Sequence, residues 1–301
     1  MIKDNIEKTK LLHIDVYSRI KAKSEGDFIR LVGINPERFE FLLSLIDGKI
    51  KEEQTENKMR LRGLKSYVRL ENQLLIFFFY IRDYPTFAKL GLSFGLSESY
   101  VFKFYEKMSA YILKVLKLPS KTKIKDLNIV QLAVDVTEQP IERPVIHQRK
   151  YFSGKKKIHT MKTLLYVCLQ TKAIVAVRTA IGTFHDFKMF KQSFHKKGIV
   201  LEEKTQIIGD SGFQGMQNLH SNTKIPHKAT KNNPLTKEQK QFNKKLAQQR
   251  VAIEHVNRAC KIFRITKETY RGKHKKFNRN WNIIAMIVNF AYYNDQYTNT
   301  A

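Results

Sequence analysis

The sequence predicts an α/β protein, in which a mixed sheet with helices on its faces follows an all-helical region. Three observations lead to this prediction. Strand and helix patterns alternate after residue 128, residues 129–134 form a near-continuous apolar run, and residues 66–118 carry a helix-turn-helix pattern. An apolar run without polar alternation is typical of a strand that is covered on both faces. Helices should therefore flank the sheet.

The charge of the chain predicts a polyanionic partner. Lys and Arg number 55 against 27 Asp and Glu, so the net charge of the 301 residues is +28. Solubility alone requires far less. Nucleic acid is the first candidate and an anionic membrane surface the second. The longest apolar run, 74–81, is too short to span a bilayer, and the N-terminus lacks the apolar core of a signal peptide. We therefore expect a cytoplasmic, nucleoid-associated protein.

The cysteines and the first 65 residues carry no chemistry that we can identify. Cys168 and Cys260 stand among apolar residues, which favours core positions in a reducing compartment over a zinc site. Residues 1–65 are helical in pattern, and a helix should begin at Asn35-Pro36-Glu37, with Asn as the cap and Pro at the first position. This N-terminal helical region predicts packing or self-association only.

Residues 66–120 predict a helix-turn-helix domain. A helix through 70–82 ends at Asp83-Tyr-Pro85, and a short helix follows over 87–93. Gly95-Leu96-Ser97 then makes a turn, with Ser97 as the cap of a helix over 98–117. An ordinary three-helix cluster fits the same pattern. The positive net charge favours DNA contact, and the basic stretch after Leu118-Pro119 predicts a domain boundary.

The remainder, residues 121–301, predicts the sheet-containing domain. We expect, in order, strands over 129–135, 163–169 and 173–180, a helix over 182–196, a strand over 205–209, and helices over 236–263 and 281–293. A loop over 138–144 and a very basic stretch over 148–162 should separate the first two strands. The turn at 170–172 predicts that the second and third strands form a hairpin.

Two of the predicted strands end in an aspartate. Asp135 follows the apolar run 129–134, and Asp210 follows the strand over 205–209. A lone Asp at a strand end usually caps a turn. Two such acids at the ends of adjacent strands can instead share a divalent metal, which offsets their mutual repulsion.

A third acid stands on the long helix over 236–263. At 100° per residue, Arg250, Glu254 and Lys261 lie within about 40° of one another, and Asn257 and Arg258 flank them. The apolar residues of this segment avoid the stripe, so we expect a mostly buried helix with one narrow polar face. A solvated Arg250–Glu254 pair is the alternative.

Two aspartates and a glutamate beside basic side chains suit two-metal phosphoryl transfer. One ion would lower the pKa of a water or a 3′-hydroxyl, and the other would stabilise the leaving oxygen. Hard oxygen ligands favour Mg²⁺ or Mn²⁺ over zinc. Arg250, Lys261 and the cluster Lys155, Lys156 and Lys157 would then contact DNA phosphates.

Five motifs in fixed order resemble those of the DDE-type transposases of bacterial insertion sequences and of related endonucleases. They are Val134-Asp135-Val-Thr-Glu138-Gln-Pro-Ile-Glu-Arg-Pro144, Tyr151-Phe-Ser-Gly-Lys-Lys-Lys157-Ile-His-Thr-Met-Lys162, Gly182-Thr-Phe-His185-Asp186-Phe, Gly209-Asp210-Ser-Gly-Phe-Gln-Gly215 and Arg250-Val-Ala-Ile-Glu254-His-Val-Asn-Arg-Ala-Cys-Lys261. Each motif alone is weak evidence, and all five in order are strong evidence. With the helix-turn-helix, the resemblance covers about four-fifths of the chain.

The resemblance implies an RNase H-like catalytic domain with a mixed five-stranded sheet. It implies Asp135 and Asp210 as the first two acids and Glu254 as the third, with two Mg²⁺ or Mn²⁺ ions. Lys162 and Arg258 would add to the DNA-binding residues. Two departures remove no ligand: Val136 stands where a Gly is common, and Ala247 where related families have a Tyr.

The implied activity is DNA transposition: binding of terminal inverted repeats, cleavage, and joining of the 3′-hydroxyl ends to target DNA, by a homo-oligomer such as a dimer. A site-specific endonuclease without strand joining and a DNA-binding protein without chemistry are the alternatives. Other motif residues are weaker candidates. His185 and Asp186 begin a helix and fit a capping role, His159 fits a phosphate contact or a surface position equally, and Glu138 fits a place behind the ligands.

Overall fold

The computed structural model describes residues 15–56, 67–119, 127–194, 198–231 and 233–293, and its chain divides into two compact units. Unit 1 holds the described residues up to Lys117 together with Ile262–Ile265, and unit 2 holds the others. Residues 1–14 and 57–65 of the predicted N-terminal helical region, and most of the predicted boundary after Pro119, lie outside the described residues. Nowhere in the described ranges is a helix long and apolar enough to cross a membrane.

Unit 1 is helical, and its core is helix α5 (Leu70–Asp83). Almost every side chain of α5 between Asn72 and Ile81 is buried. Its buried polar groups are paired: Asn72 accepts from the Tyr17 amide at 2.9 Å, and Gln73 donates to the Val68 carbonyl at 2.7 Å. The helices around it are α2 (Val16–Lys21), α3 (Glu25–Val32), α4 (Pro36–Glu56), α6 (Phe87–Phe94) and α7 (Glu98–Val115).

The last three helices of unit 1 stand where the helix-turn-helix pattern placed them. The Ser97 hydroxyl accepts from the Tyr100 amide and caps α7. Gly95 has a φ of 62°, which glycine adopts without strain. Gly91 lies so close to the Leu96 carbonyl that a Cβ would meet its oxygen at 2.5 Å. The turn is therefore built on its glycines, and whether α6 and α7 bind DNA stays a prediction.

Unit 2 is organised around a mixed sheet in the order β2-β3-β1-β5-β6, with β4 also pairing β3. β1 runs antiparallel to β3 and parallel to β5. The strands are β1 (Gln131–Pro140), β2 (Phe152–Ser153), β3 (Ile158–Cys168), β4 (Ile174–Ile181), β5 (Gln206–Ile208) and β6 (Thr223–Lys224). The described residues thus form a sheet of six strands, one more than the expected five. The two-residue strands β2 and β6 are too short to leave a periodic pattern in the sequence.

β1 and β3 are longer than the sequence predicted. β1 continues through the expected loop to Pro140, which pairs with Thr160, and β3 begins at Ile158, inside the expected basic stretch. Proline and charge in residues 138–144 read as loop signals, but Pro140 is tolerated because β5 pairs only with Gln131–Ala133. Among the described residues, that edge is then open as far as Pro140, whose carbonyl accepts from the Tyr270 amide. The open edge of β1 is where the pocket described below lies.

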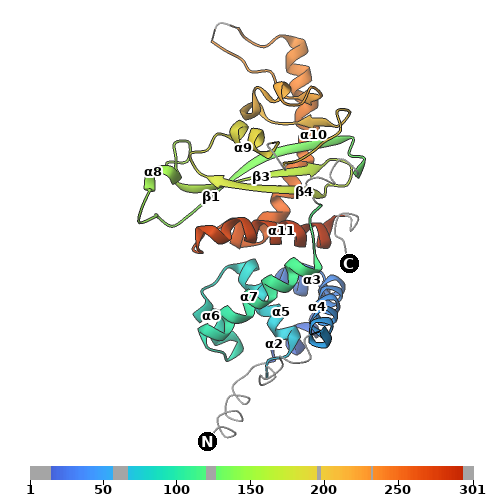
Figure 1. The fold of residues 1–301 in the computed structure, drawn as a ribbon, viewed down its shortest axis with the longest axis vertical. Coiled ribbons are helices and arrows are strands. Elements are labelled where there is room, and N and C mark those ends of the chain that lie inside the picture. The colour runs from blue at the N-terminus through green and yellow to red at the C-terminus, as the bar shows by residue number, and fades with distance from the viewer. Residues whose placement is uncertain (1–14, 57–66, 120–126, 195–197, 232, 294–301) are drawn as a thin grey trace, which may run out of the picture. The chain divides into compact units, whose positions relative to one another are not determined.

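Helices cover both faces of the sheet, as predicted (Figure 1). On one face, α9 (Asp186–Ser193) packs Met189 and Phe190 against the cluster that contains Leu132 and Tyr166. On the other face lies α11 (Phe277–Tyr292), whose buried Asn289 donates to the Ile174 carbonyl and accepts from its amide, both at 2.8 Å. The sheet of unit 2 is thus covered by helices on both faces.

Helix α10 (Lys237–Ile262) corrects one prediction, because it is not mostly buried. Its residues before Arg250 are largely exposed, apart from Leu246, and Val251 is 42% exposed. Only the second half buries a face, through Ile253, Val256 and Cys260. The apolar residues that predict burial all lie in the second half of the helix, and the first half is mostly polar. Both Cys168 and Cys260 are free and buried, as core residues should be.

Candidate active site

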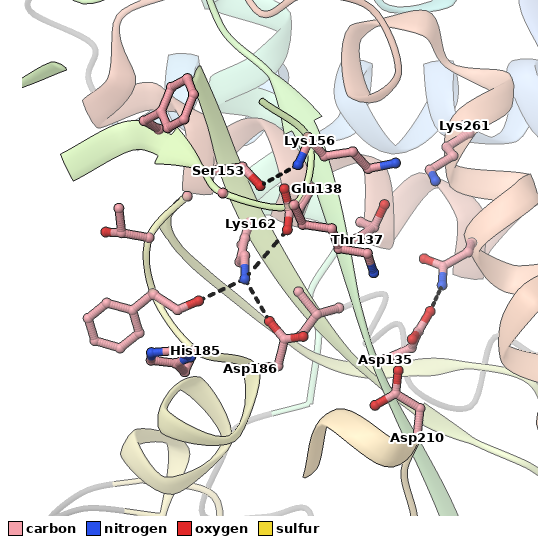
Figure 2. Close-up of a pocket in the computed structure, with 18 residues that line it drawn as sticks. Asp135, Thr137, Glu138, Ser153, Lys156, Lys162, His185, Asp186, Asp210 and Lys261 are labelled. Atoms are coloured by element: carbon pink, nitrogen blue, oxygen red, sulfur yellow. Dashed lines mark hydrogen bonds and ion pairs between the residues drawn. The ribbon is translucent and has the colours of Figure 1, made fainter. Parts of the chain in front are cut away.

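Asp135 and Asp210 lie side by side on neighbouring strands. β1 and β5 are parallel, and Ala133 is the register partner of Ile208. Each aspartate stands two residues beyond its member of this pair. Asp210 follows the end of β5, whereas Asp135 lies within β1, which continues to Pro140, so the predicted strand end at Asp135 is wrong. Figure 2 shows the two carboxylates next to each other at the edge of the pocket. The parallel register is thus the reason that two acids 75 residues apart meet.

The carboxylate of Asp135 is held by helix α10. Asn257 Nδ2 donates to Asp135 Oδ2 at 2.6 Å, and Arg250 forms an ion pair with Asp135 Oδ1 at 3.5 Å. Burial raises the pKa of Asp135 to about 6, with Arg250 opposing the rise and the negative charge of Asp210 adding to it. Asp135 is therefore an acid whose negative charge needs positive neighbours to persist.

Asp210 is oriented by the turn that follows it. Its side chain caps the short helix η2 (Ser211–Phe213), and Oδ1 accepts from the Gly212 amide at 2.8 Å. Across the described residues no ion pair to this carboxylate is found. Asp210 thus offers carboxylate oxygens to the pocket. Its negative charge lies beside Asp135 and disfavours the charged form of that carboxyl.

These acids line a cavity of about 600 Å³ along the open edge of β1. Its wall comes from β1, the turn after β2, β3, the segment before α9, the segment after β5, and α10 (Figure 2). The charged side chains in this wall are Asp135, Glu138, Asp186, Asp210, Lys155, Lys156, Lys162 and Lys261. Acids and lysines in equal number suit a site that binds both a cation and a polyanion.

Lys162 is used within the protein. Its ammonium lies 2.8 Å from the Phe184 carbonyl, 2.9 Å from Asp186 Oδ1 and 3.5 Å from Glu138 Oε1. An ammonium has three donors, of which two make these hydrogen bonds, and the contact with Glu138 is an ion pair. The side chain is only 11% exposed. The expected contact between Lys162 and DNA phosphate therefore finds no support in this geometry.

Glu254 is not part of the cavity wall. It is exposed on α10, one turn before Asn257. Within the described ranges, no three His, Cys, Asp or Glu side chains stand close enough to hold one metal ion. The structure thus brings together the two predicted aspartates and leaves the predicted glutamate outside. The side chains of the same helix that reach the site are Arg250, Asn257 and Lys261.

Comparisons with known proteins agree with this geometry. Residues 134–289, which include the whole cavity wall, match the family described as "DDE superfamily endonuclease". The chain belongs to this family. It is also 35% identical over 278 residues to the "Probable transposase for insertion sequence element IS702" of Microchaete diplosiphon, with 90% of this chain and 96% of that relative covered. The resemblance to DDE-type insertion-sequence transposases that the motifs predicted is confirmed.

Membership in the DDE endonucleases implies DNA as a partner, and the family generally uses divalent metal ions. The residues present fit such an ion. Asp135 and Asp210 supply carboxylate oxygens, and Asn257 Oδ1 is buried without a hydrogen-bond partner. Hard oxygen donors are those that Mg²⁺ and Mn²⁺ prefer. A cation here would also offset the burial, and the repulsion by Asp210, that raise the pKa of Asp135.

The basic residues predicted to bind DNA lie in different settings in this DDE endonuclease. Lys155 and Lys156 line the cavity from the exposed turn after β2, and Lys157 is exposed beside them. Lys261 lines the cavity from α10, whereas Arg258 is exposed outside the cavity wall.

The pocket carboxylates Glu138 and Asp186 and the ligand candidate Asn257 were not predicted as site residues. Glu138 and Lys162 are register partners on β1 and β3, a pairing that the sequence did not reveal because it read residues 138–144 as a loop. The His185-Asp186 motif is the signal in the sequence for Asp186 as a pocket residue, but its place at a helix start favours a capping role.

Proposed function

We propose that this protein is a DNA transposase that binds terminal inverted repeats, cleaves the DNA at the element ends and joins the 3′-hydroxyl ends to target DNA. One observation carries the proposal: two aspartates converge on neighbouring parallel strands, in a lysine-lined cavity, within a DDE endonuclease similar over 90% of its length to a probable transposase. In the first step, water attacks phosphorus and the bond to the 3′ oxygen breaks. In the second, the freed 3′-hydroxyl attacks a phosphodiester of the target, and the bond between that phosphorus and the 3′ oxygen of the target strand breaks.

In this proposal, Asp135, Asp210 and Glu254 hold two divalent ions, Mg²⁺ or Mn²⁺. Such ions supply a more acidic attacking water or hydroxyl and a stabilised leaving oxygen. The protein's own residues do the rest. Lys155, Lys156, Lys157, Lys261 and Arg258 bind phosphates of the DNA. Arg250 keeps the Asp135 carboxylate charged, since its guanidinium is the cation that pairs with that buried acid.

Glu254 is the part of the triad that rests on sequence alone. It lies on the same helix as Asn257, and we propose that it completes the ligand set when DNA and metal are bound. Changing Glu254 to Gln should then reduce cleavage by at least about 100-fold, the effect of losing one charged group in a preorganised site. Glu238→Gln, at the exposed start of α10, is the matched control and should cleave as wild type. Full activity of Glu254→Gln would remove it from the triad.

The helix-turn-helix domain 66–120 is proposed to recognise the inverted repeats, and the N-terminal region 1–65 is proposed to serve packing or self-association in a dimer that brings two element ends together. Helix α7 presents Tyr100, Phe102 and Lys103 at its surface, where side chains can reach DNA. Footprinting of the protein on the DNA that flanks its gene tests this. Protection confined to paired inverted repeats is the expected result, and uniform protection would contradict it.

Product analysis decides between transposition and its alternatives. A labelled duplex from the DNA flanking the gene is incubated with the protein, Mg²⁺ and a supercoiled plasmid. We expect labelled ends joined to the plasmid. Free cleaved ends alone would instead indicate a site-specific endonuclease without strand joining. Binding without cleavage, unchanged by Mn²⁺, would indicate a DNA-binding protein without chemistry.

A further inference from the structure

The cavity contains a second acidic pair that the proposed chemistry does not use. Glu138 and Asp186 face each other across the Lys162 ammonium (Figure 2). Lys162 and Glu138 are nearly buried, with side chains 11% and 12% exposed, and Asp186 is 32% exposed. Burying charges is costly, so a buried lysine between two acids at the wall of a catalytic pocket calls for a functional explanation.

Lys162 fastens the segment between β4 and α9 to the sheet. Its ammonium binds both the Phe184 carbonyl and Asp186 Oδ1, at the end of this segment. At the start of the segment, Gly182 passes so close to β3 that a Cβ would meet Thr160 Oγ1 at 2.4 Å. Gly182–Asp186 is thus held at both ends, and Lys162 is the side-chain link at the end that carries Asp186.

Asp186 in turn borders Asp210. Lys162 takes Asp186 Oδ1, which leaves Oδ2 facing the space above Gly212. A Cβ built on Gly212 would lie 3.4 Å from Asp186 Oδ2 and 3.0 Å from Asp210 Oδ1. The two carboxylates therefore flank the same Gly212, and η2, which Asp210 caps, packs against α9. A shift of Asp186 at the start of α9 would reach Asp210 through Gly212 and η2.

We infer that Lys162 is a positioning residue of the active centre, which acts through Asp186 to fix the carboxylate of Asp210. This inference rests on the proposed function, because it gives Asp210 a task that requires a fixed position. A misplacement of about 1 Å in a catalytic group costs on the order of 100-fold in rate. Lys162 touches neither the phosphate nor the reacting atoms, so its loss should lower kcat and leave the KM for DNA nearly unchanged.

A double-mutant cycle tests the inference. Cleavage of the labelled flanking duplex is measured for wild type, Lys162→Met, Asp186→Asn and the double variant. If Lys162 acts through Asp186, each change lowers kcat on the order of 100-fold, and the double variant is no slower than the slower single variant. Multiplied losses, a KM rise with kcat unchanged, or wild-type kcat in either single variant would each overturn it.

Mn²⁺ binding, measured by calorimetry, separates position from charge. Removing a positive charge beside a cation site should by itself strengthen Mn²⁺ binding. If Lys162 positions Asp210, Lys162→Met should instead weaken Mn²⁺ binding several-fold. Unchanged or stronger binding would overturn the inference. If Lys162→Met fails to fold, Asp186→Asn must by itself show both the kcat loss and the weaker Mn²⁺ binding, or the inference fails.

The control variant is Lys204→Met, which removes an exposed ion pair with Glu202 in the same unit and should change neither quantity. The results also distinguish this inference from the proposed function. Wild-type protein that neither binds Mn²⁺ nor cleaves DNA would overturn the proposed function and this inference with it. If the wild-type protein cleaves DNA and the kcat losses of the two single variants multiply in the double variant, this inference alone is overturned.

Discussion

At the scale of single residues, Asp135 shows how the fold places a charge where burial opposes it. Its pKa of about 6 lies above the ordinary 3.8 because the carboxyl is buried beside Asp210, despite the help of Arg250. Between these two pH values the folded protein binds a proton that the unfolded chain has released. Stability without metal should therefore fall as the pH rises from about 4 to 6, and level off above.

Asp135→Asn removes this cost. A shift of about two pKa units corresponds to about 3 kcal/mol, so in EDTA at pH 7.5 the variant should be more stable than wild type by up to about that amount. The difference should shrink towards zero near pH 4. Urea unfolding at the two pH values measures it. A variant less stable than wild type at pH 7.5 would contradict the conclusion that burying the charged Asp135 carboxylate lowers stability.

The sequence allowed both aspartates to be predicted, because each ends an apolar run and the parallel register brings their strands together. It did not allow Asn257, Asp186 or Glu138 to be predicted as pocket residues. Helical arithmetic placed Arg250, Glu254 and Lys261 on one stripe, but a stripe of about 40° cannot say which of its members points into a cavity. That depends on how α10 lies against β1, which is a tertiary contact.

At the scale of elements, a buried amide links α11 to strand β4 of the sheet. Asn289 makes two hydrogen bonds to the backbone of Ile174 in β4 and is fully buried. Asn289→Leu keeps the size of the side chain and leaves both backbone groups unpaired. Such buried groups cost roughly 1–3 kcal/mol each, so the free energy of unfolding should fall by about 2–6 kcal/mol.

The matched control is Asn282→Leu, in the same helix, where the amide donates only to the Asn278 carbonyl of its own helix. Thermal unfolding of both variants should show a loss for Asn289→Leu and little change for Asn282→Leu. Equal losses would mean that helix propensity, and not the link to β4, accounts for the effect.

Most elements were predictable because their periodicity is local: α5, α7, β4 and α11 begin or end within a few residues of the expected positions. The exceptions depend on pairing partners. Residues 138–140 belong to the predicted loop over 138–144, and they are extended because β3 pairs with them. The two-residue strands β2 and β6 are defined only by their pairing with β3 and β5.

At the scale of the whole molecule, the net charge of +28 makes DNA affinity a salt-dependent quantity. Each phosphate neutralised by a lysine adds about −0.9 to the slope of log affinity against log salt. Replacing Lys155, Lys156 and Lys157, all exposed, with Ala should therefore make the slope less steep by about 2.7. Fluorescence anisotropy between 50 and 200 mM salt, roughly the range where such losses are largest, measures it.

The control for this experiment is a variant with three exposed lysines replaced elsewhere in unit 2, Lys188, Lys204 and Lys267. It lowers the net charge by the same amount and should change the slope less. If both triple variants shift the slope equally, the protein's overall charge governs binding, and the turn after β2 is no specific phosphate contact.

The central claim is that Asp135 and Asp210 together hold the divalent ion that the nuclease activity needs. Calorimetric titration of Mn²⁺ into the wild-type protein, Asp135→Asn and Asp210→Asn tests it without relying on any DNA sequence. We expect binding by the wild type and at least about a 100-fold loss of affinity in each variant, since each removes a charged ligand. Equal Mn²⁺ binding by all three proteins would contradict the claim.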